Sequence, residues 1–487
     1  MSDRLLNMQA LLDGLVDLPE GEWPTVSGLC LDSRQVRPGD LFVALAGATE
    51  HGMKFVYQAR DKGAVAVVHD GRLASPEDLG LPELAVPGLS DRLPTLAHRF
   101  WGDAVDGLDL VAVTGTNGKT SVAWLLAQAL DGAMIGTLGF GRPGQHQTGS
   151  LTTPDIFSVY RQLADLAREG FDSVVLEASS HALDQGRLDG LSFTSTIFTT
   201  LGHDHLDYHG DRASYGAAKA RLFTEFDSER KLINLDDDFG ESLVGQLAGR
   251  GRVVGYSQAY HPDARAKAKL LSADMSGLSA EFELSCGRLE ARSSLLGRVN
   301  LWNLLIVAAE LAERGKDSEA IAAALARLEP VPGRMEPIGR DGAPLAIIDY
   351  AHTPDALETA LISARELGAG TLWCVFGCGG DRDIEKRPRM GRIAERLADH
   401  IVLTDDNPRG EDGLAIIRAI QAGMQQPQRS VVIRDRARAI SHALSSGEPG
   451  DIVLVAGKGH ETDQVIGDQR LPCDDHVSVR EALGVAA

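Results

Sequence analysis

Val111-Ala-Val-Thr-Gly-Thr-Asn-Gly-Lys-Thr-Ser121 is an apolar run that breaks into a glycine-bounded loop and then continues into an Ala- and Leu-rich stretch typical of a helix. Gly115 and Gly118 allow the backbone to turn its N–H groups toward phosphate oxygens, and the positive end of the helix points to the same place. Lys119 can neutralise charge on the outer phosphates, and the Thr120 hydroxyl can ligate Mg²⁺. The stretch therefore predicts a nucleotide-phosphate site in an α/β fold.

The strict phosphate-loop pattern requires glycine at position 113, where this chain has Val113. The order of strand, glycine loop, Lys-Thr and helix carries the prediction instead. The alternative is an ordinary turn with a solvated lysine.

Length and composition set the broad class. The 487-residue chain is too long for one core, and at about 150 residues per domain it predicts roughly three domains. A formal charge of −21, from 48 Lys and Arg against 69 Asp and Glu, argues against a surface that binds nucleic acid or an anionic membrane. The five cysteines lack paired zinc spacing, and we find neither a leader nor an apolar run of membrane-spanning length. We expect a soluble cytoplasmic protein.

Residues 1–90 predict a small α/β domain. Pro38-Gly39 forms a turn before one apolar strand, and Gly63-Ala-Val-Ala-Val-Val68 predicts another strand after a helix-like segment. Ser33 and Arg34 precede the turn, where a hydroxyl and a guanidinium could grip a phosphate-bearing ligand. Ordinary turn chemistry explains this pair about as well.

Residues 91–331 contain the phosphate loop and two further segments with polar residues near strand or helix ends. Thr153 is expected to cap a helix that has Pro154 in its first position. Ser173-Val-Val-Leu176 is a buried-type strand that ends at Glu177, where a carboxylate beside the phosphate loop could ligate nucleotide-bound Mg²⁺. A solvated glutamate is the alternative.

The segment Leu201-Gly-His-Asp-His-Leu-Asp-Tyr-His-Gly210 is rich in His and Asp but lacks the thiolate or helical spacing of a usual zinc site. One magnesium ligand among structural polar contacts is the simpler prediction. In the helix predicted next, Lys219 by itself is expected to be a surface lysine. Farther on, Asn300 and Asn303 share one helix face, where paired amides can read an adenine edge or cap a turn.

Residues 332–487 follow a Pro- and Gly-rich boundary and alternate regularly between strand and helix patterns. That rhythm predicts a parallel, doubly wound Rossmann-like sheet, with ligands at the carboxyl ends of its strands. The expected strands are Leu345–Asp349, Thr371–Phe376, His400–Thr404, Val431–Ile433 and Asp451–Ala456. Four polar, glycine-rich loops should therefore meet at one edge: 349–355, 377–383, 405–409 and 457–461.

Taken together, these motifs resemble the Mur ligases of peptidoglycan synthesis, nearly from end to end. The stretches that carry the resemblance are Thr114-Gly-Thr-Asn-Gly-Lys-Thr120, His203-Asp-His-Leu-Asp-Tyr-His-Gly210, Asp349-Tyr-Ala-His-Thr-Pro354 and Asp406-Asn-Pro-Arg409. Asp406–Arg409 and Asp32-Ser-Arg34 further resemble the members that join meso-diaminopimelate to UDP-N-acetylmuramoyl-L-alanyl-D-glutamate while ATP is cleaved. The resemblance implies a UDP-sugar-binding domain at 1–90, an ATP-binding domain at 91–331 and an amino-acid-binding domain at 332–487.

The resemblance also implies the site residues, two cofactors (ATP and Mg²⁺), small-molecule substrates and a monomer. The catalytic and metal-ligating residues would be Lys119, Thr120, Glu177, His205 and Lys219, the last as a carbamate. The ATP contacts would be Gly115, Thr116, Asn117, Gly118, Lys119, Thr120, Ser121, Asn300, Asn303 and Arg334. The UDP-substrate contacts would be Leu31, Ser33, Ala48, Thr49, Glu50, Thr152, Thr153, Ser179, Gln185 and Arg187. The diaminopimelate contacts would be Arg382, Asp406, Asn407, Pro408, Arg409, Gly457 and Glu461.

The diaminopimelate set suggests how the acceptor is selected. Diaminopimelate carries a second zwitterionic end, so Arg409 could hold its carboxylate while Glu461 faces its ammonium group. The alternatives within the superfamily are a lysine-adding ligase, a D-alanyl-D-alanine-adding ligase and folylpolyglutamate synthase. A nucleotide-dependent switch is the alternative from another class, and a structural protein would leave the polar strand-end loops unexplained.

Overall fold

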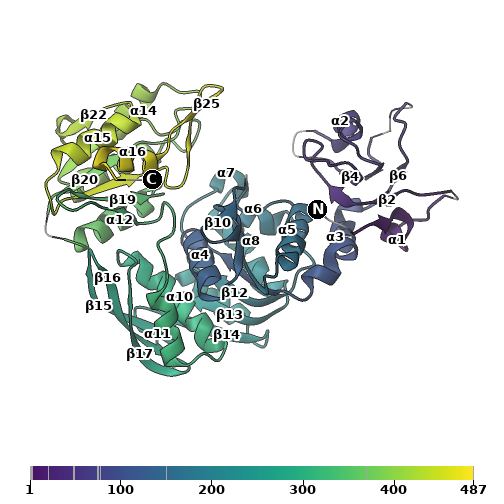
Figure 1. Cartoon of the computed structure of the whole chain (residues 1–487), viewed down its shortest axis with the longest axis horizontal. Coiled ribbons are helices and arrows are strands. Elements are labelled where there is room, and N and C mark those ends of the chain that lie inside the picture. Colours follow the sequence, from purple (N-terminus) through teal and green to yellow (C-terminus); the bar gives the residue numbers. More distant parts are fainter. Residues whose placement is uncertain are drawn as a thin grey trace. The chain divides into compact units, whose positions relative to one another are not determined.

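The computed structural model describes residues 4–19, 21–47, 50–73, 76, 78–149, 151–368 and 370–485. Figure 1 labels the helices and strands along the chain. The chain divides into two compact units. Unit 1 comprises Met1–Ile233 and Asp237–Val253, and unit 2 comprises Asn234–Asp236 and Val254–Ala487. None of the helices in the described part of the chain combines the length and apolar character needed to cross a membrane.

Unit 1 begins with a small sheet of four parallel strands in the order β3-β4-β5-β6. The expected turn at Pro38-Gly39 precedes β4, and Gly39 adopts φ +92°, a backbone conformation that favours glycine. The elements here are β1 (Leu6–Asn7), α1 (Met8–Leu12), β2 (Thr25–Val26), β3 (Gly28–Cys30), β4 (Asp40–Ala44), η1 (Gly52–Phe55), α2 (Val56–Asp61), β5 (Ala66–His69) and β6 (Glu83–Ala85). The sequence-based expectation of a small α/β fold is met.

The rest of unit 1 is a larger sheet in which the strand order β8-β11-β7-β12-β13 is parallel and β9 and β10 continue it antiparallel. Glu177 of β11 pairs with Val113 of β7, so both strands end at the edge that carries the phosphate loop. The strands are β7 (Asp109–Thr114), β8 (Ala133–Gly136), β9 (Gly139–Arg142), β10 (Gln145–Gln147), β11 (Ser173–Glu177), β12 (Phe193–Phe198) and β13 (Ser228–Asn234). The helices are α3 (Leu89–Val105), α4 (Lys119–Ala129), α5 (Ile156–Arg168), α6 (Ser180–Asp184), α7 (Leu206–His209), α8 (Arg212–Thr224) and α9 (Asp238–Gln246).

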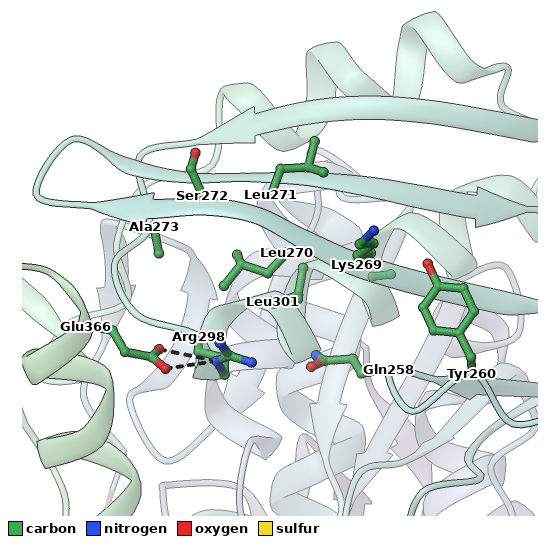
Figure 2. Close-up of a pocket in the computed structure, with 11 residues that line it drawn as sticks. Gln258, Tyr260, Lys269, Leu270, Leu271, Ser272, Ala273, Arg298, Leu301 and Glu366 are labelled. Atoms are coloured by element: carbon green, nitrogen blue, oxygen red, sulfur yellow. Dashed lines mark hydrogen bonds and ion pairs between the residues drawn. The ribbon is translucent and has the colours of Figure 1, made fainter.

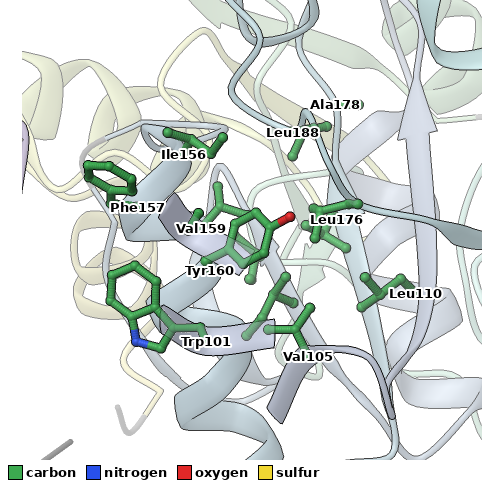
Figure 3. Packing of buried hydrophobic residues seen from close by; sticks show 14 of the residues in the cluster. Trp101, Val105, Leu110, Ile156, Phe157, Val159, Tyr160, Leu176, Ala178 and Leu188 are labelled. Atoms are coloured by element: carbon green, nitrogen blue, oxygen red, sulfur yellow. The ribbon is translucent and has the colours of Figure 1, made fainter. Parts of the chain in front are cut away.

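Helices α3 and α5 pack together over the small and large sheets of unit 1. Trp101 of α3 contacts Phe157 of α5, with ring centroids 6.2 Å apart, and Tyr160 lies one turn farther along α5 (Figure 3). These side chains join Leu110 and Leu176 of the large sheet in one buried cluster. Each such buried side chain contributes about 1.5–3 kcal/mol to stability. The cluster holds β7 and β11, and therefore the polar residues at their ends, in a fixed register.

Unit 2 begins with an antiparallel ribbon, β15-β16-β17, in which β14 pairs in parallel with β15. Two helices follow the ribbon, and α11 packs against β17 while α10 packs against β15 and β16. The elements are β14 (Arg252–Ser257), β15 (Ala266–Asp274), β16 (Gly277–Leu284), β17 (Gly287–Ser293), α10 (Val299–Glu313) and α11 (Ser318–Ala326).

The second sheet of unit 2 has the strand order β18-β19-β23-β20-β21-β22. All neighbours are parallel except β18, which pairs antiparallel with β19, so the predicted doubly wound parallel sheet is confirmed with one antiparallel edge. The strands are β18 (Glu336–Ile338), β19 (Leu345–Asp349), β20 (Leu372–Phe376), β21 (His400–Leu403), β22 (Ser430–Val432), β23 (Ile452–Ala456), β24 (Asp463–Ile466) and β25 (Gln469–Pro472). The helices are α12 (Pro354–Glu366), α13 (Lys386–Leu397), α14 (Gly413–Gln421), η2 (Pro427–Arg429), α15 (Arg436–Ser446) and α16 (Asp475–Leu483).

The helices cover both faces of this sheet. One face packs Leu361 of α12 and Ile420 of α14 against the inward residues of the strands, and the other packs Ile440 of α15 and Val479 of α16. The strands are buried on both sides, which explains why their sequences are continuous apolar runs. The carboxyl ends of β19, β20, β21 and β23 lie at one edge of the sheet, as predicted.

Candidate active site

The phosphate loop has the predicted order of strand, loop and helix, with β7 leading through residues 115–118 into α4. Gly115 adopts φ +150°, and a Cβ there would come within 1.8 Å of the Thr199 Oγ1. Thr199 donates a hydrogen bond to the Asn117 carbonyl at 2.6 Å. The Nζ of Lys119 lies 2.8 Å from the Gly115 carbonyl oxygen, so the lysine is held against the loop that it would serve.

Glu177 lies next to this loop with a carboxylate that is 1% exposed. The Thr120 hydroxyl donates to its Oε2 at 2.9 Å. The Thr137 backbone N–H donates to Oε1 at 2.8 Å, and the Thr137 hydroxyl to Oε2 at 3.2 Å. The alternative of a solvated glutamate is therefore wrong, because three donors converge on this buried carboxylate.

The expected helix cap at Thr153 is wrong. Helix α5 begins at Ile156, and Asp155 caps it by accepting from the Phe157 and Ser158 N–H groups at 3.1 Å. Thr153 instead donates to the Glu177 carbonyl at 2.6 Å. A partner 24 residues away outcompetes the local cap, and it ties the 152–153 segment to the end of β11.

Lys219 is a buried residue, so the expectation of a surface lysine is also wrong. Its side chain is 1% exposed and donates to the Gly115 carbonyl at 2.8 Å, and its Nζ lies 4.4 Å from the centre of the Tyr215 ring. Burial and, to a smaller extent, the neighbouring charge of Lys119 hold the pKa of this amine well below its usual range. A lysine in this environment supplies an uncharged, nucleophilic amine.

The His- and Asp-rich segment forms a cluster of rings next to Tyr215. His181 lies 4.8 Å from His205 and 4.2 Å from Tyr208 between ring centroids. His209 contacts Tyr215 at 5.3 Å and shares a 3.0 Å hydrogen bond with the Ser180 hydroxyl. Burial lowers the pKa of the histidines at 181, 205 and 209, which keeps imidazole nitrogens available as ligands or acceptors near neutral pH.

The predicted metal ligands suit Mg²⁺ by their chemistry. Thr120 and Glu177 provide hard oxygen donors 2.9 Å apart in a buried position beside the phosphate loop, which is what a nucleotide-bound Mg²⁺ requires. Lys219 reaches the same loop at the Gly115 carbonyl. Among the residues that the structure describes, no group of three or more His, Cys, Asp or Glu side chains is arranged to hold a metal ion without further ligands. A magnesium ion bound by Thr120 and Glu177 would therefore need further oxygen ligands from the nucleotide.

Several predicted UDP-substrate contacts form one network. Arg187 donates to the Thr153 carbonyl at 2.7 Å and to the Gln185 side chain at 2.6 Å. Gln185 in turn donates to the Tyr208 hydroxyl at 3.1 Å. Ser179 caps α6, and its hydroxyl oxygen lies 3.3 Å from the Thr153 hydroxyl oxygen. The structure therefore brings the predicted residues between 153 and 187 together.

The residues near the small N-terminal sheet that are predicted to bind the UDP-linked substrate make their observed contacts within unit 1. Ser33 is buried and donates to Gln58 of α2 at 2.7 Å. Glu50 pairs with Lys54 at 3.1 Å, and Leu31 packs against the core of unit 1. The predicted contacts Ala48 and Thr49 lie outside the described residues.

In unit 2 the residues predicted to contact the nucleotide are held by neighbouring side chains. Asn303 donates to the Asn300 side chain at 2.8 Å, which confirms that both lie on one face of α10. The Arg334 guanidinium stacks 4.1 Å above the Tyr350 ring. Burial raises the pKa of the neighbouring Asp349 carboxyl, and the charge of Arg334 opposes this shift.

The predicted diaminopimelate contacts meet at the carboxyl edge of the second sheet. The Asn407 side chain donates to Glu461 at 2.9 Å, and its Oδ1 accepts from the Val465 N–H at 3.0 Å. Lys458 is fully buried. Its Nζ lies 3.3 Å from Glu461 and 3.4 Å from the side-chain Oδ1 of Asn407, and it also donates to the backbone carbonyl of Asp463. Tyr350 donates to the other oxygen of Glu461 at 3.4 Å.

Sequence reasoning gave no separate role to Tyr350, Lys458 or Thr137. The first two lie inside glycine-rich strand-end loops that were singled out as a group. Their roles depend on partners that are distant in the sequence, so only their position at a strand end could have marked them.

The side chains of Arg409 and Arg382 both lie close to Gly379, which is on the same loop as Arg382. A Cβ at Gly379 would come within 2.8 Å of the Arg409 Nη1 and 3.9 Å of the Arg382 Cγ. Arg409 adopts φ +51° and donates to the Gly380 carbonyl at 2.9 Å. Gly457 adopts φ +116°, and a Cβ there would meet the Asp406 Oδ2 at 2.7 Å. These close approaches bring the loops after β20, β21 and β23 together, as the strand order predicts.

A separate cavity of about 520 Å³ also belongs to unit 2 (Figure 2). Arg298, at the start of α10, points across it to Glu366 of α12, with its Nε 3.2 Å from both carboxylate oxygens. None of the lining residues is a predicted site residue. They are Gln258, Tyr260, Ala268, Lys269, Leu270, Leu271, Ser272, Ala273, Arg298, Leu301 and Glu366.

Comparison with known proteins gives one consistent family. Residues 25–100 match the model of the Mur ligase family catalytic domain, residues 113–311 the Mur ligase middle domain, and residues 333–459 the Mur ligase glutamate ligase domain. A UDP-N-acetylmuramoyl-L-alanyl-D-glutamate--2,6-diaminopimelate ligase of Alkalilimnicola ehrlichii is 47% identical over 495 residues, covering 99% of each chain.

Solved structures agree with the family models. The chain resembles the structure of a UDP-N-acetylmuramoyl-L-alanyl-D-glutamate--2,6-diaminopimelate ligase with a TM-score of 0.69 and 34% identity over 99% of both chains. It also shares the fold of the MurF ligase of Thermotoga maritima in complex with ADP, with a TM-score of 0.65 and 19% identity over 94% of this chain and 96% of that one.

Proposed function

The chain belongs to the Mur ligase family, and from that premise we propose that it is the ligase that joins meso-diaminopimelate to UDP-N-acetylmuramoyl-L-alanyl-D-glutamate, with ATP cleaved to ADP and phosphate. The observation that carries the acceptor assignment is the 47% identity, over 99% of both chains, to a relative of that name. The hydrogen bond between Asn407 and Glu461 at the carboxyl edge of the second sheet, where the Arg409 loop also lies, supports it from the side of the structure.

The chemistry requires charge neutralisation and alignment. A carboxylate is a poor acyl donor, so the free carboxylate of the UDP-linked substrate first attacks the γ-phosphorus of ATP, which gives an acyl phosphate and releases ADP. The acceptor amine then attacks the acyl carbon, and phosphate leaves from the tetrahedral intermediate as the amine loses a proton. Lys119 and the N–H groups of residues 115–121 would hold the β- and γ-phosphates during the first step. Asn300, Asn303 and Arg334 would contact the rest of the nucleotide.

Mg²⁺ would be held by Thr120 and Glu177, with His205 and a carbamate of Lys219 as ligands of a second ion. When bound, it would neutralise phosphate charge and polarise the phosphoryl oxygens. The buried Lys219 amine suits this role because an uncharged amine can attack CO₂, forming an N–C bond and losing a proton. The product is an anionic oxygen ligand in place of a cation.

The UDP-linked substrate would be bound by residues of unit 1. Thr152, Thr153, Ser179, Gln185 and Arg187 offer hydroxyl, amide and guanidinium groups in one network. Leu31, Ser33, Ala48, Thr49 and Glu50 would contact the uridine end.

Two side chains of opposite charge would recognise the acceptor substrate, diaminopimelate. Arg409, with Arg382 beside the same glycine, would hold the distal carboxylate of diaminopimelate, and Glu461 would face the distal ammonium group. The carboxylate of Asp406, the Asn407 amide, the Pro408 backbone and the space left by Gly457 would complete the pocket. Lysine lacks the distal carboxylate, so its binding would leave Arg409 without its partner.

The test is phosphate release with ATP, Mg²⁺ and the UDP-linked substrate, with meso-diaminopimelate or L-lysine added in parallel. We expect release with diaminopimelate and at least about 100-fold lower kcat/KM with lysine. Arg409→Ala should lose the diaminopimelate reaction, whereas Arg396→Ala, which removes an exposed arginine paired with Glu358, serves as the matched control.

The outcomes separate the alternatives. Equal release with lysine would remove the Arg409 argument but keep a ligase. Release that needs no amino acid would favour a nucleotide-dependent switch. We further propose that the enzyme acts as a monomer in the cytoplasm, where ATP and UDP-linked sugars are available, and sedimentation analysis with and without substrates tests the monomer.

A further inference from the structure

A short chain of hydroxyl groups leads from the buried carboxylate of Glu177 to Thr152. The Thr137 Oγ1 lies 3.2 Å from the Glu177 Oε2 and 3.0 Å from the Thr152 Oγ1. Thr137 occupies the turn between β8 and β9. The turn fits closely against the carboxylate, because a Cβ at Gly136 would come within 2.2 Å of the Glu177 Oε1.

The carboxylate fixes the direction of this chain. Glu177 accepts hydrogen bonds from the Thr120 hydroxyl, the Thr137 backbone N–H and the Thr137 hydroxyl, so it acts as an acceptor throughout. A hydroxyl has one proton, and that of Thr137 is directed to Glu177. The 3.0 Å contact between the two threonines must therefore use the proton of Thr152. Thr152 is left with lone pairs only, and it can act toward a ligand only as an acceptor.

We propose that Thr137 is a positioning residue that couples the nucleotide and metal site at Glu177 to the UDP-substrate site at Thr152. It orients the Glu177 carboxylate and sets Thr152 as an acceptor, so that the substrate group facing Thr152 is an N–H or O–H donor. The proposal rests on the proposed function, which assigns Glu177 to the metal and Thr152 to the UDP-linked substrate.

The coupling is reciprocal. A cation bound at Glu177 would weaken the carboxylate as an acceptor for the Thr137 hydroxyl, and this would change how strongly Thr152 accepts. If the bound nucleotide changes the affinity for the UDP-linked substrate by some factor, the bound substrate must change the affinity for the nucleotide by the same factor. A substitution that removes the Thr137 hydroxyl would break the chain of hydroxyl groups. The hydrogen bond from the Thr137 backbone N–H to Glu177 would remain.

The test is a thermodynamic cycle measured by isothermal titration calorimetry. The affinity of UDP-N-acetylmuramoyl-L-alanyl-D-glutamate is measured for the wild-type protein, Thr137→Val and Thr137→Ser, each with and without Mg²⁺ and a non-hydrolysable ATP analogue. We expect the nucleotide to change the affinity of the wild-type protein by about fivefold or more. Thr137→Val should lose most of this factor, and Thr137→Ser, which keeps the hydroxyl, should retain most of it.

Thr152→Val provides a second variant that cuts the same chain at its far end. It leaves all three donors on Glu177, so the affinity for the nucleotide alone should stay within about twofold of wild type while the coupling is lost. Thr152→Ser is its matched control. A Thr152→Val protein with full coupling would overturn the proposal even if Thr137→Val fails to fold.

The remaining outcomes distinguish this proposal from the proposed function. Wild-type protein that binds both ligands without coupling, or Thr137→Val with the wild-type coupling factor, would overturn the role of Thr137 and leave the ligase assignment intact. Wild-type protein that binds neither ligand would overturn the proposed function, and the role of Thr137 with it.

Discussion

Lys219 shows how strongly a buried position changes the chemistry of one side chain. The amine is 1% exposed, and burial lowers its pKa well below the usual range for lysine. The folded state therefore prefers the uncharged amine, whereas the unfolded chain binds a proton at neutral pH. Folding has to release that proton, which costs stability that a methionine of similar shape would not cost.

We expect Lys219→Met to abolish ligase activity while raising the unfolding midpoint, by about 2–4 °C for each kcal/mol of stability that is recovered. Thermal unfolding in CO₂-free buffer and phosphate-release assays measure the two effects. Lys231→Met, which removes another buried lysine of unit 1, is the control and should keep ligase activity. A destabilised but active Lys219→Met would contradict both the burial argument and the carbamate.

Lys458 has a different role, because it stays close to charged and polar partners. Its Nζ lies 3.3 Å from Glu461 and 3.4 Å from Asn407. Both of these residues are predicted to contact the diaminopimelate substrate. We expect Lys458→Met to raise the KM for diaminopimelate by about tenfold or more, since a charged hydrogen bond is worth about 1.5–3 kcal/mol. The KM for ATP should change little. Steady-state kinetics with each substrate varied in turn would measure this, and an equal rise in both KM values would refute a role confined to the acceptor.

Residues whose position follows from a local pattern could be placed from the sequence. The loop from Gly115 to Thr120 and the carboxylate of Glu177 belong to this group, because strand, loop and helix follow one another in the chain. The contact of Thr137 with Glu177 and that of Lys458 with Asn407 could not be predicted, since the partners are 40 and 51 residues apart. Thr153 was predicted to cap a helix because the local pattern allows it, but a stronger distant acceptor was not visible in the sequence.

At the scale of elements, buried strands were predictable and half-exposed strands were not. The five strands expected between 345 and 456 lie within two residues of their observed bounds, because both faces of the sheet are covered and the strands are continuous apolar runs. The ribbon of β15, β16 and β17 was not predicted. Its strands alternate between buried and exposed residues, and long polar side chains interrupt the apolar pattern.

The C-terminal helix α16 is attached to β18 by a titratable residue. His476 lies 2.7 Å from Glu336 and 3.2 Å from Asp474. Burial alone would lower the pKa of His476, but hydrogen bonds to Asp474 and Glu336 outweigh it and raise the pKa to about 9. Because this is above the unfolded value of about 6.5, the contribution to stability is fully present below about pH 6.5 and is lost as the pH rises through 9.

We therefore expect the free energy of unfolding to fall between pH 6.5 and 9, and this part of the fall should be absent in His476→Gln. Urea unfolding at pH 6, 7.5 and 9, followed by far-UV circular dichroism, would measure the difference. Glu336→Gln removes one of the two acceptors and should reduce the pH-dependent part. A wild-type protein and a His476→Gln protein with parallel pH profiles would contradict the assigned pKa.

At the scale of the whole molecule, the substrates would be bound by residues of three predicted domains. We therefore expect these domains to close around the substrates before the reaction, with hinges near Ser90 and at Pro332-Gly333. Gly333 adopts φ +67°, and a Cβ there would come within 2.4 Å of the Gly459 backbone, so this hinge lies close to an acceptor loop within unit 2. We expect small-angle scattering to show compaction with the UDP-linked substrate, diaminopimelate and a non-hydrolysable ATP analogue together. The nucleotide alone serves as the control, and an unchanged radius of gyration with all three ligands would argue against closure.

The strand order of the second sheet determines when this sheet can form during synthesis. β23 lies between β19 and β20 and pairs with both, yet it is the last of the sheet's strands to leave the ribosome. Until residues 452–456 emerge, β19 and β20 each present an unpaired apolar edge of the kind that promotes association between chains. The nascent chain must therefore stay protected, by chaperones or by its own earlier domains, until β23 has emerged and can pair with both strands.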